Sequence, residues 1–434
     1  MKTDIIIIGS GPGGYRTASY ALQQGKQVVI IEKAEAGGTC LNSGCIPTKC
    51  LAHDAEANAS DFPAAAERKR NVMDQLRQGI EQLLSAPGIT LVRGEATFKD
   101  ARTVTVDGTD YEADDIIIAT GSSSKMPPVE GIDNPRVITS TEALNFQTLP
   151  AEIVIIGAGV IGMEFASILS RFGAKVSVIE YLKECLPVID KNIAKRVRKQ
   201  IEKLQGVTFY MDSAVKAIND NEVVFVSNKN GKETRLECPA CPVLIATGRK
   251  PNIEGLNLEA AGVEYSPKGI TVNDNMLTSV PHIYAIGDVT GRQMLAHAAT
   301  FMGFRAVNAI VGKADKIRFD IMPSAIFTYP EAAAVGLTED QCKQQGIECR
   351  SLKGYYRANG KALAIEEPEG MVKLVAGADG KILGCTSYGA HSADIVQEVT
   401  AYMNCNATVA DIADSVHIHP TLSEILQDAC VDGH

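Results

Sequence analysis

The sequence predicts an α/β fold, because a unit of apolar strand, glycine-rich loop and helix occurs at the start of the chain and recurs in its middle. In the first unit an apolar run over residues 4–8 leads into Gly9, Gly11 and Gly14, and helix-forming residues follow over 15–22. A strand that ends in a Gly-x-Gly-x-x-Gly loop and passes into a helix is typical of a parallel sheet covered by helices.

The glycine spacing of the first unit indicates a dinucleotide site. Glycines at these positions permit a tight turn, a close approach of backbone to a pyrophosphate and close packing of helix on strand, while the helix N-terminus offers N–H donors to the anion. A second strand over 27–31 ends in Glu32, the acid expected to bind a ribose hydroxyl. With strand, loop, helix and acid in this order, a dinucleotide site is a better interpretation than a simple glycine-rich turn.

The second unit repeats this arrangement, with a strand over 152–156, a helix over 163–172 and a further strand over 175–179 that ends in Glu180. Its loop contains the glycines Gly157, Gly159 and Gly162. In both units the acid follows the first loop glycine by 23 residues (9 to 32, and 157 to 180). Two dinucleotides are therefore predicted. Because a carboxylate repels a 2′-phosphate and no Arg follows Glu180, the second site is expected to take NAD rather than NADP.

Three more apolar strands end in glycine-containing segments, over residues 116–121, 244–249 and 283–288. The first two close on Ala-Thr-Gly, so we expect Thr120 and Gly121 to face the first dinucleotide and Gly248 to face the second. The third delivers Asp288 to the carboxyl edge of the sheet, where open α/β sheets bind ligands.

A redox-active disulfide is predicted at Cys40 and Cys45, which are followed by Lys49 one helical turn after the second cysteine. A dithiol and a disulfide interconvert through a thiolate, and a nearby lysine or helix N-terminus favours the thiolate. Both would be present if Pro47 opens a helix. Two ordinary buried cysteines are the alternative interpretation, which the neighbouring dinucleotide loop disfavours.

Composition is consistent with a large enzyme of roughly two to four domains. The 42 Lys and Arg against 52 Asp and Glu give a formal net charge of −10, and there is no long basic run. This argues against nucleic acid or an anionic membrane surface as a partner. No apolar stretch approaches the length of a membrane span, and a strand begins at once at the N-terminus, so we expect no signal peptide and a cytoplasmic location.

The eleven cysteines do not predict structural disulfides, because a reducing cytosol disfavours them and most of these positions resemble small core hydrophobes. Cys238 and Cys241 form a C-x-x-C pair, for which a metal site and a second redox site are the two functional alternatives. No second pair of ligands stands at metal spacing, which disfavours both functional alternatives, and we predict no metal centre.

On these motifs the chain resembles the FAD- and NAD(P)-dependent disulfide oxidoreductases, the family of dihydrolipoamide dehydrogenase, glutathione reductase and mercuric reductase. The resemblance runs from Met1 to about Asp428 and implies two Rossmann-like domains, which bind FAD and NAD, and a C-terminal α+β dimerisation domain. The expected divisions are an FAD-binding domain with the redox disulfide over 1–150, an NAD-binding domain over 151–250, a return to the FAD or central domain over 251–319 and an interface domain over 320–434.

The resemblance also implies a role for each residue of the redox centre. Cys40 would exchange thiols with the substrate, Cys45 would contact the flavin, and Asp288 would bind the ribityl chain of FAD. Lys49 would lie near flavin N5, paired with Glu164, which offsets the cost of burying the lysine.

Near the C-terminus His419 and Glu424 match the family's acid–base motif His-Pro-x-x-x-Glu, and His417 is a nearby decoy. Oxidation of a dithiol needs a base for the thiol proton, and imidazole suits this near neutral pH. The resemblance implies a homodimer in which the histidine of one subunit completes the disulfide site of the other.

The resemblance favours oxidation of dihydrolipoamide by NAD⁺, because residues 11–15, 294–297, 357–359 and 419–424 look closer to dihydrolipoamide dehydrogenase than to glutathione reductase. Lipoyl domains of 2-oxoacid dehydrogenase or glycine cleavage complexes are then expected partners. The short segment 50–98 and Thr48 instead resemble a shorter branch that includes the copper-reducing flavoprotein of reactive-chlorine defence, so an NADH-dependent metal or disulfide reductase is the alternative. A redox sensor without turnover is the third hypothesis, which the intact cysteine and histidine motifs disfavour.

Overall fold

The computed structural model describes residues 1–57 and 61–431, and its first sheet contains seven strands in the order β3-β2-β1-β6-β5-β4, with β19 beside β6. The strands are β1 (Lys2–Ile8), β2 (Val28–Glu32), β3 (Ile89–Arg93), β4 (Ala96–Phe98), β5 (Thr103–Val106), β6 (Thr109–Ile118) and β19 (Ile283–Ala285). β19, β6, β1, β2 and β3 run parallel, and β4 and β5 add an antiparallel extension. Because β19 pairs with β6, the chain returns to this sheet after it has built the second one.

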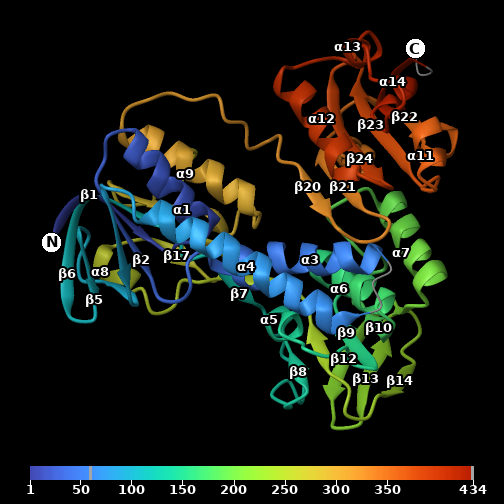
Figure 1. Cartoon of the computed structure of the whole chain (residues 1–434), viewed down its shortest axis with the longest axis horizontal. Helices are drawn as coiled ribbons and strands as arrows, with labels where there is room; N and C mark the ends of the chain where they lie inside the picture. The colour runs from blue at the N-terminus through green and yellow to red at the C-terminus, as the bar shows by residue number, and fades with distance from the viewer. Residues whose placement is uncertain (58–60, 432–434) are drawn as a thin grey trace.

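Two helices far apart in sequence, α1 (Pro12–Gln23) and α9 (Ala296–Ile310), lie side by side against the first sheet (Figure 1). The apolar run of β1 explains this cover, since Ile5, Ile6 and Ile7 are fully buried and need apolar partners on both faces. The parallel pairing and the helical cover confirm the first predicted Rossmann-like unit.

The second sheet is also parallel, in the order β11-β10-β9-β15-β8. Its strands are β8 (Val137–Ile138), β9 (Glu152–Ile156), β10 (Lys175–Ile179), β11 (Thr208–Tyr210) and β15 (Val243–Ile245). The helices α6 (Val160–Arg171) and α7 (Lys191–Gln205) accompany it, and an antiparallel sheet of β12 (Ser213–Ile218), β13 (Glu222–Ser227) and β14 (Glu233–Glu237) shares an apolar cluster with it. The strand β8 lies within the segment expected to bind FAD, yet it pairs into this second sheet.

The C-terminal part is an antiparallel sheet in the order β20-β21-β24-β23-β22, with helices packed on it. Its strands are β20 (Ser324–Ile326), β21 (Ala332–Gly336), β22 (Cys349–Tyr355), β23 (Met371–Gly377) and β24 (Ile382–Tyr388). Its helices include α12 (Ser392–Asn404), α13 (Val409–Ala413) and α14 (Glu424–Val431). Two parallel sheets followed by an α+β unit are the fold class that the sequence predicts.

The helix after the redox motif begins earlier than the sequence suggests. Helix α3 spans Cys45–Glu56, so Pro47 stands at its third position and Cys45 itself opens it, directly after α2 (Gly38–Ser43). A proline is tolerated in the first turn because its N–H would have no partner within the helix there. The helix can start at Cys45 because Gly44 makes the tight bend: a Cβ on Gly44 would lie 2.8 Å from the carbonyl oxygen of Thr39.

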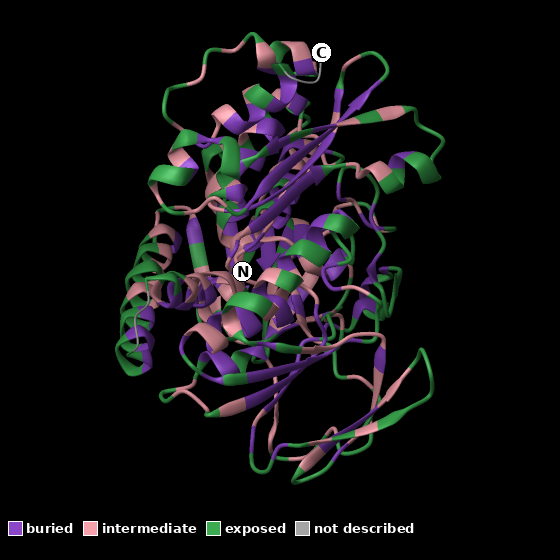
Figure 2. Ribbon diagram, turned by 90° about the vertical axis from the view of Figure 1, so that its right-hand side faces the viewer, coloured by how far each residue is buried: buried purple, intermediate pink, exposed green. Residues whose placement is uncertain are grey.

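One apolar cluster joins the three parts of the molecule. It contains residues of α3 and α4 (Phe62–Leu84), of the second sheet, and of the C-terminal sheet, including Ile326 and Tyr388. In Figure 2 the strands are largely buried, while the helices alternate buried and exposed residues. The redox motif on α2 and α3 is therefore held where all three parts meet. Within the described residues, no helix has the length and apolar character that crossing a membrane requires.

Candidate functional site

The two glycine-rich loops have the same geometry. Gly9 and Gly157 both have φ of +105°, and a Cβ on either would lie 2.4 or 2.5 Å from the carbonyl oxygen of Ala119 or Ala246, respectively. A Cβ on Gly14 or Gly162 would lie 1.8 or 1.9 Å from the carbonyl oxygen of the first glycine of its own loop. The fold itself therefore requires the first and third glycines, as packing of loop on strand and of helix on loop predicts.

The middle glycines are not required by the protein. A Cβ on Gly11 would have its nearest neighbour at 3.9 Å, and a Cβ on Gly159 would meet no atom within 4 Å. Both glycines are helix N-caps, and neither α1 nor α6 has a side-chain cap for the N–H groups of its first turn. The protein therefore leaves room beside each of these uncapped helix N-termini. The pyrophosphate of a dinucleotide fits such a site.

The acids at the ends of β2 and β10 also have matching contacts. Glu32 accepts hydrogen bonds from the N–H groups of Ser10 and Ala34, both at 2.8 Å, and from the Ser10 hydroxyl at 2.7 Å. Glu180 accepts hydrogen bonds from the N–H groups of Ala158 and Leu182. Each acid thus fastens its glycine loop to the following strand, in addition to its predicted contact with a ribose.

A cavity of about 1820 Å³ extends between the two parallel sheets and reaches the C-terminal sheet. It is larger than the roughly 300–1,000 Å³ of a site for one small ligand, so it has room for two dinucleotides. Most of the predicted site residues line it: Gly9, Gly11, Glu32, Cys40, Cys45, Lys49, Thr120, Gly121, Asp288, Gly157, Gly159, Glu164, Glu180 and Gly248. Gly14 and Gly162 instead stand behind it, against their own loops.

The redox pair lines this cavity from α2 and α3. A hydrogen bond from Cys40 and the ammonium of Lys49 lower the pKa of the Cys45 thiol to about 7, against the opposing effects of burial and of Glu164. The hydrogen bond with Cys45, together with burial, raises the pKa of Cys40. In the dithiol form Cys45 is therefore the more acidic of the two thiols.

Lys49 is held by Glu164 across the boundary of the first two parts. Lys49 Nζ donates to both carboxylate oxygens of Glu164 at 2.9 and 3.0 Å, and the main-chain N–H of Phe327 donates to one of them at 2.9 Å. The Phe327 ring lies 4.7 Å from the ammonium. The nearly buried carboxylate fixes the lysine beside the cysteines and balances its charge.

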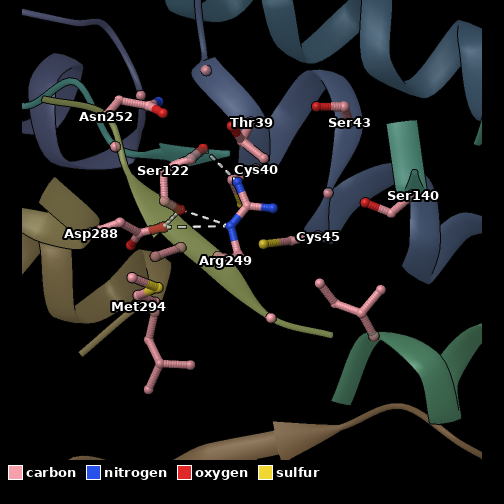
Figure 3. A pocket seen from close by; sticks show the side chains of 18 of the residues that line it. Thr39, Cys40, Ser43, Cys45, Ser122, Ser140, Arg249, Asn252, Asp288 and Met294 are labelled. Atoms are coloured by element: carbon pink, nitrogen blue, oxygen red, sulfur yellow. Dashed lines mark hydrogen bonds and ion pairs between the residues drawn. The ribbon is translucent and has the colours of Figure 1, made fainter. Parts of the chain in front are cut away.

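Sequence reasoning missed Arg249. Its side chain extends toward Cys45 in Figure 3, Nε donates to the Ser122 hydroxyl at 2.7 Å, and the guanidinium lies 3.9 Å from the Asp288 carboxylate. With Lys33 and Lys49 it is one of three Lys or Arg side chains among the described residues that line the cavity, and it directly follows the second Ala-Thr-Gly, where β16 (Arg249–Pro251) begins. The sequence does contain a signal for this residue, because Arg249 is a cation directly after that tripeptide, near the carboxyl end of a buried strand.

His419 and Glu424 form a pair outside the cavity. The carboxylate can only accept, so His419 Nδ1–H donates to Glu424 Oε1 at 2.8 Å, and the Thr421 N–H holds the other oxygen at 2.7 Å. The side chain of His419 is 80% exposed, and neither residue of the pair lines the cavity. Within one chain this pair therefore does not meet the cysteines.

The decoy His417 differs from His419 at its ring nitrogens. In His417 both nitrogens have acceptor partners, the Ser415 carbonyl at 2.8 Å and Glu398 at 2.9 Å. His419 Nε2 has no partner among the described residues. Of these two histidines, His419 is therefore the one that offers a nitrogen to take a proton from an incoming molecule.

Comparison with known proteins gives matches along the whole chain. Residues 3–303 match the family model for pyridine nucleotide-disulphide oxidoreductases, and residues 322–430 match the dimerisation domain of that family. Dihydrolipoyl dehydrogenase 3 of Haloarcula marismortui is 37% identical over 458 residues, covering 99% of this chain and 96% of the relative. Dihydrolipoyl dehydrogenase of Bacillus subtilis is 37% identical over 449 residues, covering 98% of this chain and 97% of the relative.

Among solved structures, the HOCl-induced flavoprotein disulfide reductase RclA of Escherichia coli superimposes with a TM-score of 0.90 at 30% identity, covering 99% of both chains. A Cu(II) complex of the same protein gives the same values.

Proposed function

The chain belongs to the pyridine nucleotide-disulphide oxidoreductase family, and from this premise we propose that it oxidises dihydrolipoamide to lipoamide and reduces NAD⁺. It is an oxidoreductase that uses FAD and NAD, and its match to the dimerisation domain supports a homodimer. The substrate, the roles of individual residues and the domain divisions at 150, 250 and 319 are parts of the proposal.

We assign FAD to the first loop and NAD to the second. The residues for FAD are Gly9, Gly11, Gly14, Glu32, Lys49, Thr120, Gly121 and Asp288, and those for NAD are Gly157, Gly159, Gly162, Glu180 and Gly248. The open space at the two middle glycines supports this assignment. When bound, the flavin carries an electron pair between the cysteine pair and the nicotinamide.

The thiol chemistry falls to Cys40 and Cys45. A substrate thiolate attacks the Cys40 sulfur, the bond between the two cysteine sulfurs breaks, and Cys45 leaves as a thiolate beside Lys49. The second substrate thiolate then attacks the substrate sulfur of the mixed disulfide, the bond from that sulfur to Cys40 breaks, lipoamide leaves, and the Cys40 thiolate takes up a proton to become a thiol. The low pKa of Cys45 supports this order, because the better leaving group is the more stable thiolate.

The observation that carries the proposal is the pair of His419 and Glu424. A dithiol substrate must lose protons before it can attack, and His419 Nε2 is available for them while Glu424 fixes the tautomer. The hydrogen bond from Thr421 and the contact with His419 lower the pKa of Glu424, which keeps it ionised near neutral pH. A base that stands exposed on one chain, apart from that chain's own cysteines, is consistent with action on the disulfide of a second subunit.

A metal or disulfide reductase that consumes NADH is the second candidate. It is supported by the likeness to the Escherichia coli flavoprotein disulfide reductase, which was also solved as a Cu(II) complex. Reduction of a metal ion has less need of a base for a thiol proton. Lipoyl domains of 2-oxoacid dehydrogenase or glycine cleavage complexes are the partners expected only under the first candidate.

His419→Gln separates the two candidates. It is expected to lower dihydrolipoamide oxidation by on the order of 10² or more, the scale of general acid–base catalysis, while reduction of the flavin by NADH changes little. His417→Gln is the matched control and should retain activity. Parallel assays use dihydrolipoamide with NAD⁺, and glutathione disulfide or Cu²⁺ with NADH. Negligible oxidation of dihydrolipoamide beside rapid copper reduction would move the function to the second candidate.

A mixed dimer tests whether the histidine acts across subunits. One subunit carries Cys40→Ser and the other His419→Gln, so each chain alone lacks one required group. If His419 serves the partner's disulfide, one of the two sites is intact and activity returns to about half of the wild-type value per dimer, an equal-share expectation for two equivalent isologous sites. If it serves its own chain, the mixed dimer stays inactive.

A further inference from the structure

A second pair of cysteines lies in a surface turn of the NAD-binding part. Cys238, Pro239, Ala240 and Cys241 connect β14 to β15, and the N–H of Cys241 donates to the carbonyl of Cys238 at 3.4 Å. Proline at the second position and a φ of +58° at Ala240 are features of a type II turn. Pro239 and Ala240 are exposed, whereas both cysteines are buried beneath them.

The guanidinium of Arg136 contacts both sulfurs. Its Nη1 lies 3.2 Å from Cys238 Sγ and 3.8 Å from Cys241 Sγ, and it also donates to the two cysteine carbonyls at 2.9 and 3.3 Å. Nη2 donates to the Glu222 carbonyl at 2.7 Å, and Nε is buried without a partner. All these partners are carbonyls or sulfurs, and none described for this guanidinium is a carboxylate.

A partly buried cation without a carboxylate needs another counter-charge, since burial of an unpaired charge is costly. A thiolate of the turn can supply it. Hydrogen bonding from Cys241 and the Arg136 guanidinium lower the pKa of Cys238 to about 6, against the opposing effects of burial and of the Glu152 carboxylate. The same hydrogen bond, together with burial, raises the pKa of Cys241. The pair therefore has one thiolate and one thiol, the combination that forms a disulfide readily.

A metal site does not fit this turn. A zinc ion needs four ligands, and the described residues contain no group of three or more His, Cys, Asp or Glu side chains suited to a metal. The positive guanidinium of Arg136, which contacts both sulfurs, also repels a metal cation. The turn is separate from the catalytic cavity, because neither Cys238 nor Cys241 lines it; both belong to the apolar cluster shared with the three-stranded sheet.

We propose that Cys238 and Cys241 are a redox-modification site, which a hydroperoxide converts to a second disulfide under Arg136. The Cys238 thiolate attacks one peroxide oxygen, so that an S–O bond forms, the O–O bond breaks and hydroxide leaves. The Cys241 sulfur then attacks Cys238, the S–S bond forms, the S–O bond breaks and the oxygen leaves as water. In total two thiols and one hydrogen peroxide give one disulfide and two waters, and a thiol reductant reverses the change.

The oxidant is small because the sulfurs are buried. The two middle residues of the turn, Pro239 and Ala240, are exposed, so we expect a slight movement of this turn to admit hydrogen peroxide. Glutathione disulfide is far larger and needs the turn to open.

Peptide mass spectrometry of the holoenzyme tests the proposal. The dimer is reduced, treated with hydrogen peroxide at pH 7, alkylated in denaturant and digested with trypsin. Residues 236–249 form one tryptic peptide with both cysteines of the turn, and residues 34–49 form another with the catalytic pair. The expected product is the 236–249 peptide without alkyl groups and two hydrogens lighter. If it stays doubly alkylated when the 34–49 peptide is fully oxidised, the proposal is overturned.

Cys342 and Cys349 provide a matched pair within the same sample. They also share a hydrogen bond, but burial and that bond raise the pKa of Cys342 to about 11. They should stay alkylated at the dose that oxidises the turn. Equal oxidation of both pairs would overturn the role given to Arg136.

Variants of Arg136 separate redox activation from a structural role. Arg136→Gln should slow disulfide formation in the turn by about tenfold or more, because the thiolate fraction at pH 7 falls. Arg136→Lys retains the charge and should stay within about threefold of the wild type by the same relation. Glutathione disulfide should act at least about tenfold more slowly than peroxide at equal concentration, because buried cysteines react slowly with bulky reagents. Equal rates in the two arginine variants would overturn the electrostatic argument, and a faster reaction with glutathione disulfide would overturn the choice of oxidant.

Discussion

Replacing Gly159 by alanine is expected to weaken NADH binding without destabilising the fold. The backbone at Gly159 has φ of −72° and ψ of −172°, a conformation that any L-residue adopts. An added Cβ would meet no protein atom within 4 Å. We therefore expect the limit on residue size at Gly159 to come from the proposed ligand, with its pyrophosphate in the space beside the uncapped start of α6.

The size of the effect follows from this geometry. A Cβ forced against a closely packed ligand costs about 1–3 kcal/mol, which corresponds to a roughly 5- to 150-fold rise in the KM for NADH. Thermal stability should change by no more than about 0.5 kcal/mol. At Gly162 the expectation is opposite, because a Cβ there would lie 1.9 Å from the carbonyl oxygen of Gly157, well under the 3.0 Å that Cβ atoms keep. Gly162→Ala should cost about 3 kcal/mol and lower the Tm by about 5 °C.

The assay combines thermal unfolding with steady-state oxidation of NADH by an electron-accepting dye. Gly11→Ala is the matched control in the first loop, where the nearest atom to an added Cβ is 3.9 Å away. It should lower the amount of FAD that copurifies with the protein, whereas Gly159→Ala leaves that amount unchanged. An unchanged KM in Gly159→Ala, or an unchanged Tm in Gly162→Ala, would refute the reasoning.

Three further predictions concern charge. In the reduced enzyme, alkylation of Cys45 should rise with a midpoint near pH 7, since the Cys40 hydrogen bond and Lys49 lower the thiol pKa to about 7. In Lys49→Met the midpoint should move upward, and a midpoint that stays in place would contradict the role of the lysine. The kcat/KM for NADH should exceed that for NADPH by on the order of 10², because Glu180 repels a 2′-phosphate; comparable values would exclude this discrimination. Glu331→Gln should raise the Tm more at pH 8 than at pH 5, because burial raises the pKa of Glu331 to about 7. The contribution of the protonated Glu331 to the free energy of unfolding is fully present below the usual glutamate pKa of about 4.3. It is lost as the pH rises through about 7, where the buried carboxyl group ionises. A gain in Tm independent of pH would contradict this reasoning.

Features set by the local chain were predictable from the sequence. The first glycine of each loop has a positive φ, and a Cβ on the third would lie 1.8 or 1.9 Å from the carbonyl oxygen of the first, so these two constraints act within one short loop. The spacing from Gly9 to Glu32 and from Gly157 to Glu180 follows from the length of one strand, one helix and one further strand. The fold class and the two dinucleotide loops were therefore predictable without coordinates. The start of the helix after the redox motif was misplaced by two residues, because proline is compatible with any position of the first turn.

Contacts between distant segments were decided only by the tertiary structure. The pairing of Lys49 with Glu164 was inferred from resemblance alone, and it joins residues 115 positions apart. Arg249 reaches Asp288 and the neighbourhood of Cys45 because three strand ends converge on one cavity, which no sequence pattern encodes. Arg136 meets the turn of Cys238 and Cys241 from 102 positions away, and this contact turns an ordinary C-x-x-C pattern into an activated pair. The physical reason is that a local sequence specifies which φ and ψ a segment can adopt, whereas the counter-charge of a buried ion comes from whichever segment the packing of the core places beside it.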